Sequence, residues 1–205
     1  EMKSRRRDIL LGTERRLEGR KDGRTIVKYI SKSVDDLLLH GWKLLPEEVR
    51  LQVDVVGIGG YGRSELCPFS DWDILFLIPD RVEKKVSASI SKFSQLIWDI
   101  GGQLGHSVRT ISDAKKFFEE DHHARTAFLE SRLIAGRGES YKNLYKLETP
   151  VNWDKKLRTE FCRHKIQECY ERRLKLGNTA FCMEPDCKNG KGGLRDVSTI
   201  FWLSM

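Results

Sequence analysis

Two short apolar runs lie close together in the chain, and the stretch that joins them restricts the folds the chain can adopt. Residues 51–58 are rich in β-branched side chains and stop at glycines, and residues 74–78 form a second such run. Both runs are typical of buried strands. The connection contains Pro68, and Ser70-Asp71 indicates a turn, so at most about two helical turns fit there. We therefore expect two neighbouring strands with no full helix between them.

The same stretch also spells a dinucleotide-binding fingerprint. The glycines of G-x-G-x-x-G are Gly57, Gly59 and Gly62, and Asp80 follows the second apolar run. That fold requires a helix after the third glycine, long enough to cross the sheet before the next strand. Residues 63–72, RSELCPFSDW, have no apolar periodicity and are broken by a proline, so they disfavour a redox cofactor site. A phosphate-binding P-loop is excluded because no G-x-x-x-x-G-K-[ST] motif occurs.

Two acidic residues, Asp71 and Asp73, flank Trp72 where the second strand begins. Side chains alternate between the faces of a strand, so both carboxylates are expected on one face and the indole on the other. A close pair of carboxylates suits Mg²⁺, which binds hard oxygen ligands together with phosphate groups. Such ions can support an in-line phosphoryl transfer. The motif therefore predicts Asp71 and Asp73 as metal ligands and catalytic residues.

The glycine pair supplies a second part of the predicted nucleotide site. Gly59 and Gly60 allow the backbone to approach a triphosphate closely, with N–H groups pointing at it. Arg63 could contact phosphate oxygens, and Ser70 could bond a phosphate or cap the turn. A lone Gly-Gly is more often a tight turn, and a lone D-x-D is more often solvated. Their combination between two strands is more specific and predicts nucleotide binding by these four residues.

The remaining pattern predicts one more strand and several helices. The apolar spacing indicates helices over residues 26–39, 84–100, 113–121, 124–135 and 153–176, and a short strand over 106–110. A glycine-rich turn over 189–196 opens a last helix. We therefore predict an α+β fold. A small mixed sheet flanked by helices is expected over residues 26–112, and an all-helical segment over 113–205.

Basic residues exceed acidic ones, and much of the excess lies near the N-terminus. The 205 residues carry a formal net charge of +7, from 37 basic and 30 acidic side chains. The basic stretch from Lys3 to Arg24 predicts a solvated or partly disordered arm over residues 1–25. No aromatic residue interleaves these charges, so nucleic acid is not the expected partner.

The sequence carries no membrane or secretion signal. No apolar run is long enough to cross a bilayer, and the basic residues 5–7 precede no long apolar segment. The cysteines are odd in number and form no C-x-x-C motif, so we expect free thiols in a reducing cytoplasm; they are Cys67, Cys162, Cys169, Cys182 and Cys187. The last apolar run is interrupted at Met205, which suggests a piece of a longer protein.

Gly-Gly followed at this distance by D-x-D resembles the signature of the DNA polymerase β-like nucleotidyltransferase superfamily. More narrowly, GGYGRSEL and SDWDILFL resemble the uridylyltransferase domain of the bifunctional PII-uridylyltransferase family. Three further segments support this resemblance: GHSVRT at 105–110, ESRLIAG at 130–136 and EPDCKNGKGGLRDVSTIFW at 184–202. GHSVRT followed by GKGGLRD is much more specific than the glycine and D-x-D motifs alone.

The resemblance implies a nucleotidyltransferase that passes UMP from UTP to a tyrosine hydroxyl of the PII signalling protein. Pyrophosphate would leave, Mg²⁺ would be required, and no membrane or nucleic acid would be involved. It implies Gly59 and Gly60 as phosphate-binding residues and Asp71 and Asp73 as metal ligands. Family members also carry a hydrolase domain and glutamine-sensing domains, which this chain lacks. Transfer of AMP to another protein, or a catalytically inactive nucleotide-binding module, remains an alternative.

One departure from the superfamily pattern concerns a third carboxylate on the next strand, which is often taken as the base that activates the acceptor. The expected strand, HSVRT, contains no carboxylate. His106 is a candidate base because its ordinary pKa lies near neutral pH. Gln103, Asp113 and Glu130 lie nearby in sequence, and a base from elsewhere, or none, is also compatible.

Three basic residues outside the core motif are weaker candidates for nucleotide binding. Lys191 and Arg195 of GKGGLRD could reach the triphosphate from the helical segment. Equally, the two glycines could form a turn, and an Arg195–Asp196 ion pair could hold the last helix. Arg109 could contact phosphate or form an ordinary salt bridge.

Overall fold

The computed structural model describes residues 1–181 and 184–205, and of Leu147 only the backbone. Cys182, which we expected to be a free thiol, lies outside the described residues. The chain divides into two compact units, Glu1–Lys146 and Leu147–Met205, and each is described by itself.

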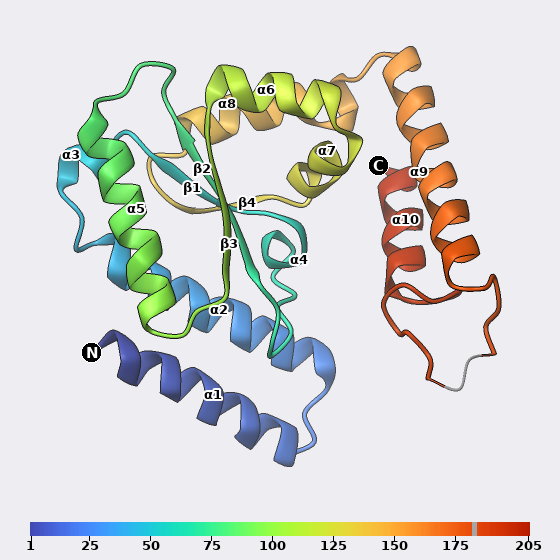
Figure 1. The fold of residues 1–205 in the computed structure, drawn as a ribbon, viewed down its shortest axis with the longest axis horizontal. Helices are drawn as coiled ribbons and strands as arrows, with labels where there is room; N and C mark the ends of the chain where they lie inside the picture. The colour runs from blue at the N-terminus through green and yellow to red at the C-terminus, as the bar shows by residue number, and fades with distance from the viewer. Residues whose placement is uncertain (182–183) are drawn as a thin grey trace. The chain divides into compact units, whose positions relative to one another are not determined.

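The first unit combines helices with a small sheet (Figure 1). Its helices are α1 (Met2–Glu18), α2 (Gly23–Trp42), α3 (Glu47–Arg50), α4 (Gly59–Gly62), α5 (Lys84–Asp99), α6 (Ile111–Glu120), α7 (His122–Leu129) and α8 (Glu139–Glu148), the last of which ends just inside the second unit. Its strands are β1 (Asp54–Gly57), β2 (Trp72–Ile78), β3 (Leu104–Thr110) and β4 (Arg132–Ala135). The second unit contains the 3-10 helix η1 (Pro150–Asn152), α9 (Lys155–Lys175) and α10 (Leu194–Ser204).

The sheet has the strand order β3-β2-β1-β4. Strand β1 runs antiparallel to β2 and β4, whereas β2 and β3 are parallel because α5 crosses over between them. The sheet is therefore mixed, and the predicted α+β class is confirmed. The connection between β1 and β2 contains only the single-turn helix α4, as the interrupted sequence there predicted.

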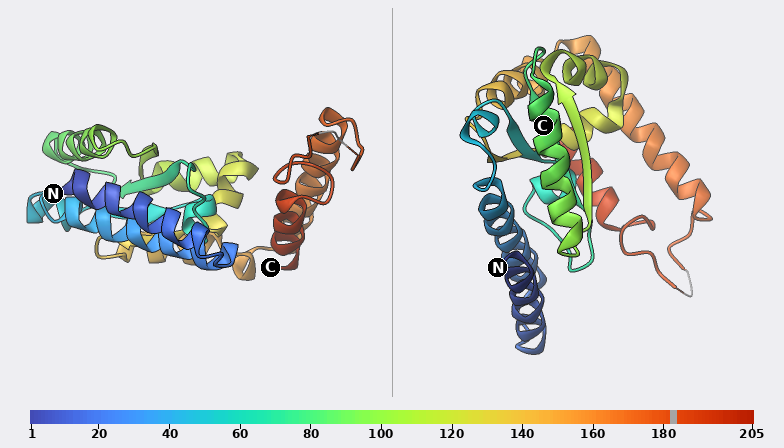
Figure 2. Two further views of the ribbon diagram at one scale, coloured as in Figure 1. Left: turned by 90° about the horizontal axis from the view of Figure 1, so that it is seen from below. Right: turned by 60° about the vertical axis from the view of Figure 1, so that its left-hand side comes forward.

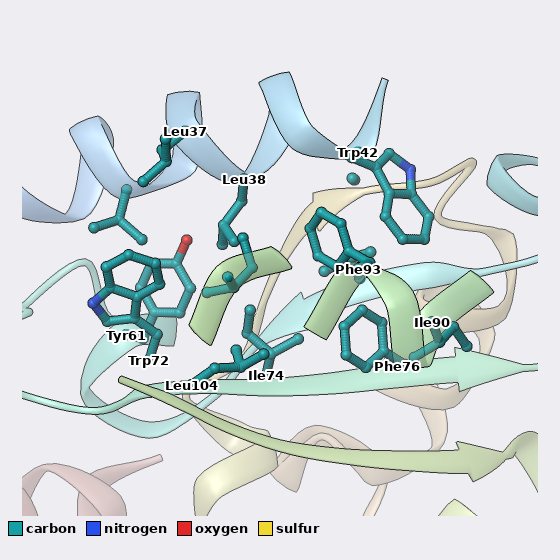
Figure 3. Packing of buried hydrophobic residues seen from close by; sticks show 14 of the residues in the cluster. Leu37, Leu38, Trp42, Tyr61, Trp72, Ile74, Phe76, Ile90, Phe93 and Leu104 are labelled. Atoms are coloured by element: carbon teal, nitrogen blue, oxygen red, sulfur yellow. The ribbon is translucent and has the colours of Figure 1, made fainter. Parts of the chain in front are cut away.

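One face of the sheet is covered by α2 and α5, whose apolar residues recur at helical spacing. The centre of this core is aromatic: Phe76 of β2 packs against Trp42 of α2 and Phe93 of α5, with ring centroids 6.4 and 6.2 Å away (Figure 3). Trp72 and Ile74, which precede Phe76 at intervals of two residues, are buried on the same face (Figure 3). Alternation along β2 thus commits its intervening residues to the opposite face.

The opposite face is covered by a smaller core. Leu75 and Leu77 of β2 pack there with Val56 of β1, under aromatic residues of α6 and α7. Phe118 and Phe128 stack with ring centroids 4.4 Å apart. This second layer leaves the beginning of β2, where Asp73 lies, outside the apolar cluster.

The N-terminal residues form a packed helix, so the predicted solvated arm over 1–25 is wrong. Helix α1 lies alongside α2 (Figures 1 and 2), and its Met2 and Ile9 are buried in the larger core. The guanidinium of Arg16 lies 3.4 Å from the centroid of the Tyr29 ring. The basic charges hid this packing because they dominate the composition of the helix, and only two of its large apolar residues, Met2 and Ile9, are buried.

The predicted division at residue 112 also differs from the structure. The helix expected over 124–135 ends at Leu129, and the residues Arg132–Ala135 form β4 at the edge of the sheet. Helices α6 and α7 pack on the same sheet, so the first unit continues to Lys146. Pairing with β1, which is distant in sequence, decides the strand conformation of this segment.

Candidate active site

The D-x-D motif straddles the start of β2. Trp72 is the first residue of the strand, and its side chain is 4% exposed in the core under α2 and α5. Asp73 follows and is exposed on the opposite face. Asp71 directly precedes the strand and is also exposed, and the same alternation predicts it on the side of Asp73. The motif therefore presents carboxylate oxygens to solvent from a rigid strand.

The glycine turn lies directly beside Asp73. The N–H of Ile58 donates to the carbonyl of Asp73 at 3.0 Å, which extends the β1–β2 pairing up to the turn. Gly59 has a φ of 57°, a left-handed conformation that favours glycine. A Cβ placed on Gly59 would lie 4.0 Å from Oδ2 of Asp73, so no side chain separates this backbone from the carboxylate. The structure thus brings together Gly59 and Asp73 of the predicted site.

A partly buried hydrogen-bond network holds the turn in place. The hydroxyl of Tyr61 donates to Asp35 of α2 at 2.6 Å, and Arg132 of β4 donates to both oxygens of Asp35 at 2.7 and 3.0 Å. Arg132 also donates to the carbonyls of Tyr61 and Gly62, both at 3.3 Å. Burial, and then the negative charge of Asp35, raise the pKa of Tyr61 well above its ordinary value. The hydroxyl therefore remains a donor, and α4 is anchored to α2 and β4.

Arg63, a predicted phosphate ligand, follows α4 and is engaged by two carboxylates. Its Nε donates to Glu65 at 2.7 Å, and its Nη1 donates to Glu130, whose side chain is 4% exposed. Burial alone would lower the pKa of Arg63, but the hydrogen bond to Glu65 and the charge of Glu130 outweigh it and raise the pKa. A phosphate would therefore have to share or displace these partners.

Ser70 stabilises the turn that precedes the D-x-D motif. Its Oγ accepts from the N–H of Cys67 at 3.3 Å, and its own N–H donates to the carbonyl of Cys67 at 3.1 Å. This geometry is the turn-capping alternative of the two that the sequence left open. The hydroxyl proton of Ser70 is not used by these bonds, so its role toward a phosphate stays a prediction.

His106 lies on the opposite face of the sheet from Asp73. Its ring packs against Phe76 and Trp98, with centroids 5.8 and 5.5 Å away, on the side covered by α5. Partial burial there holds the pKa of His106 below its ordinary value. The structure therefore does not bring the candidate base His106 together with Asp73.

Arg109 is on the face of Asp73 but at the other end of the strand. It pairs with Leu77 of β2, and its guanidinium lies 3.5 Å from the centroid of the Phe117 ring in α6. Asp80, which closes β2, accepts from the N–H and Oγ of Ser112 at 3.0 and 2.7 Å. This end of the sheet is thus occupied by contacts with α6, away from the glycine turn.

Comparison with known proteins identifies relatives of the chain. Residues 160–205 match a family model described as GlnD PII-uridylyltransferase. A bifunctional uridylyltransferase/uridylyl-removing enzyme of Azospirillum brasilense is 39% identical over 155 residues, which are 74% of this chain and 16% of that protein. Proteins with the same description from Cupriavidus metallidurans and Pseudoalteromonas translucida are 36% identical over 179 residues and 40% identical over 152 residues. These matches cover 87% and 73% of this chain, and 20% and 17% of those proteins.

The chain is homologous to part of these bifunctional enzymes. It spans between 16% and 20% of the length of these three relatives. Among its described residues, no helix is both long and apolar enough to cross a membrane.

The GKGGLRD segment of this homologue lies in the second unit and is organised around Asp196. The carboxylate of Asp196 accepts from Arg173 at 2.8 Å, from Arg172, and from the N–H of Gly192 at 2.9 Å. Burial alone would raise the pKa of Asp196, but these hydrogen bonds outweigh it and hold the pKa well below its ordinary value. The Arg195–Asp196 ion pair, one of the two alternatives that the sequence left open, is therefore not the one formed, because two arginines of α9 bind Asp196.

Lys191 and Arg195 belong to the turn and first residues around α10. Lys191 is exposed, and Arg195 is half-buried. Their role as nucleotide ligands stays a prediction.

The residues that support the site do not stand out in the sequence. Asp35 and Arg132 were not singled out, because their pairing joins residues 97 positions apart. Gly105 was quoted in GHSVRT without a role, although it lies opposite Asp73 in the parallel β2–β3 pair. An isolated glycine in a strand indicates a close approach of another group, and this signal was available from the sequence.

Proposed function

We propose that this chain carries a uridylyltransferase site that passes UMP from UTP to a tyrosine hydroxyl of a PII signalling protein, releasing pyrophosphate. The observation that supports it most directly is the carboxylate of Asp73 beside the unobstructed backbone of Gly59. Homology to enzymes described as uridylyltransferases supports a nucleotide site here over a solvated turn.

The residues present fit the Mg²⁺ that such a reaction requires. Asp71 and Asp73 offer exposed carboxylate oxygens from neighbouring positions at one end of β2, and oxygen is the donor Mg²⁺ prefers. We propose these two residues as its ligands and as the catalytic residues. When bound, the ion would neutralise charge on the triphosphate and on the departing pyrophosphate.

The chain's own groups have separate tasks in this proposal. The backbones of Gly59 and Gly60 receive the triphosphate, because a side chain there would obstruct a close approach. The Tyr61–Asp35–Arg132 network keeps this turn in one conformation, so less ordering is needed when the nucleotide binds. Arg63 and Ser70 remain candidates for contacts with the phosphate oxygens.

Strand β3 brings no carboxylate to the face that carries Asp73. Alternation places Gly105, Ser107 and Arg109 on that face, whereas His106 lies on the other. We therefore do not assign His106 as the base that accepts the tyrosine proton. The acceptor hydroxyl would lose its proton to a group outside β3 or to water.

Substitution of the two acids tests the proposal. The chain is incubated with Mg²⁺, a PII protein and either labelled UTP or labelled ATP, beside an Asp71→Asn/Asp73→Asn variant. Asp80→Asn is the matched control, since it changes a carboxylate at the other end of β2. We expect label from UTP on PII, reduced about 100-fold or more in the double variant and retained in the control.

Each other result contradicts a defined part of the proposal. Equal labelling by the double variant would remove Asp71 and Asp73 from the reaction. Label from ATP alone would replace uridylyl transfer by adenylyl transfer. UTP binding without any transfer, both in the chain and in the full-length protein, would identify an inactive nucleotide-binding module.

A further inference from the structure

Gly105 is the residue of β3 that lies opposite Asp73, one of the proposed metal ligands. The parallel register pairs the two residues directly. A Cβ placed on Gly105 would lie 2.9 Å from Oδ1 of Asp73, closer than real Cβ contacts allow. This carboxylate oxygen is the one atom within 4 Å of that position, apart from the neighbouring residues of the chain. A side chain at residue 105 would therefore collide with the Asp73 carboxylate alone.

The backbone conformation does not explain why residue 105 is a glycine. Gly105 is absent from the residues with positive φ, which include Gly59 and Gly101 among the glycines. Its φ lies in the range that any residue in a strand adopts. Glycine in the interior of a strand is otherwise unfavourable, because it has no side chain to pack and loses more conformational freedom. What the glycine provides is the space that the Asp73 carboxylate occupies, because any larger residue would force that carboxylate to move.

The Asp73 carboxylate lies between two glycine backbones. Oδ2 is 4.0 Å from the position that a Cβ would take at residue 59, and Oδ1 is 2.9 Å from the corresponding position at residue 105. A side chain on β3 at this point would rotate or displace the carboxylate. Strand-mounted groups hold a precise geometry only where their rotamers are defined by what surrounds them.

We propose that Gly105 is a positioning residue: by lacking a side chain, it allows the Asp73 carboxylate to occupy the place beside the glycine turn from which it acts. The consequence for catalysis rests on the proposed function, in which Asp73 holds Mg²⁺. The steric contact itself stands independently of that function and is tested separately below.

The steric contact is tested by a double-mutant cycle on unfolding, measured without nucleotide or metal. The proteins are the unmodified chain, Gly105→Ala, Asp73→Ala and the double variant. We expect the change in thermal midpoint caused by Gly105→Ala to be less favourable by about 2–4 °C when Asp73 is present than in the Asp73→Ala background, because only then must the carboxylate move. In the Asp73→Ala background the added methyl group should cause no loss, because the oxygen it collides with is gone. Equal losses in both backgrounds would overturn the proposal.

The consequence for catalysis is tested by transfer kinetics across Mg²⁺ concentrations. We expect Gly105→Ala to reduce kcat by about 10–100-fold and to raise the Mg²⁺ concentration needed for half-maximal rate. Gly23→Ala is the matched control, because a Cβ there meets no atom within 4 Å and its φ is not positive. This control should leave the rate and the Mg²⁺ requirement unchanged.

The same measurements separate this proposal from the proposed function. If Asp73→Asn abolishes transfer while Gly105→Ala matches the unmodified chain at every Mg²⁺ concentration, the positioning role is overturned and the function stands. If neither substitution alters transfer, the assigned function of Asp73 fails. A reduced kcat with an unchanged Mg²⁺ requirement would also count against positioning of a metal ligand.

Discussion

Each of the two units of the chain is stabilised internally by a different kind of interaction. The first unit buries a continuous apolar core between its sheet and the helices α2 and α5, with Phe76 fully buried at its centre. In the second unit, buried polar groups join α9 and α10. Asp196 accepts from Arg172 and Arg173, and Lys165, 2% exposed, pairs with Glu168 beside the Trp202 ring.

Apolar side chains also behave differently in the two units. Those of the sheet and of α2 are largely covered, whereas both helices of the second unit expose large ones: Ile166, Tyr170, Leu174, Leu194, Val197, Ile200 and Phe201. The stability of a unit that depends on burial of apolar surface should change little with salt concentration or pH. The stability of a unit that depends on a charged cluster should respond to both. The comparison therefore predicts separate sensitivities for the two parts of the chain.

The largest expected effect comes from removing the centre of the apolar core. Phe76→Ala deletes a side chain that packs against Trp42 and Phe93, and it should lower the free energy of unfolding of the first unit by about 3–5 kcal/mol. Denaturant unfolding measures the loss. Phe69→Ala is the matched control, because Phe69 is 86% exposed, and it should change stability by less than about 0.5 kcal/mol. Similar losses for both variants would contradict a core centred on Phe76.

A smaller and more local effect is expected in the second unit. Asp196→Asn keeps the shape of the side chain but removes the charge that Arg172 and Arg173 share, which should destabilise this unit by about 2 kcal/mol. Hydrogen exchange should accelerate in α9 and α10 and remain unchanged in the sheet. Glu171→Gln, at an exposed position of α9, should leave exchange unaltered. Faster exchange throughout the sheet would contradict the independence of the two stabilising networks.

The same cluster predicts how the second unit responds to pH. Because folding lowers the pKa of Asp196 below its ordinary value, its contribution to stability is fully present above about pH 4. That contribution is lost as the pH falls below this value toward the lower pKa of the folded state. Relative to the intrinsic amide exchange rate, which itself falls with pH, the protection of α10 should therefore decrease on acidification from pH 5 to pH 3. The Asp196→Asn variant should show a weaker dependence. An identical dependence in both proteins would exclude Asp196 as its source.

The smallest effect should come from the network under the glycine turn. Tyr61→Phe removes the hydrogen bond to Asp35, which keeps its two bonds from Arg132, and should cost about 1 kcal/mol. Denaturant unfolding measures the cost, and exchange near α4 should increase. Tyr170→Phe, whose side chain is largely exposed, should have no effect on either measurement. An unchanged stability for Tyr61→Phe would show that Arg132 alone anchors Asp35.

The sequence alone determined the two central strands, the absence of a full helix between them and the opposite faces of Trp72 and Asp73. These features depend on nearest neighbours: a proline, a turn and the two-residue repeat of a strand. Only the tertiary structure placed β4 in the sheet and α1 against α2, because both depend on partners distant in the chain.

The same distinction applies inside the candidate site. Which residue of β3 faces Asp73 depends on the register between two strands, and a shift of one residue would exchange Gly105 for His106. The sequence contained both residues but not the register. Likewise, GKGGLRD contained Asp196 and an arginine beside it, yet packing of α10 on α9 selected Arg172 and Arg173 as its partners. The sequence shows which residue types are present, but contacts between segments distant in the chain decide which of them pair.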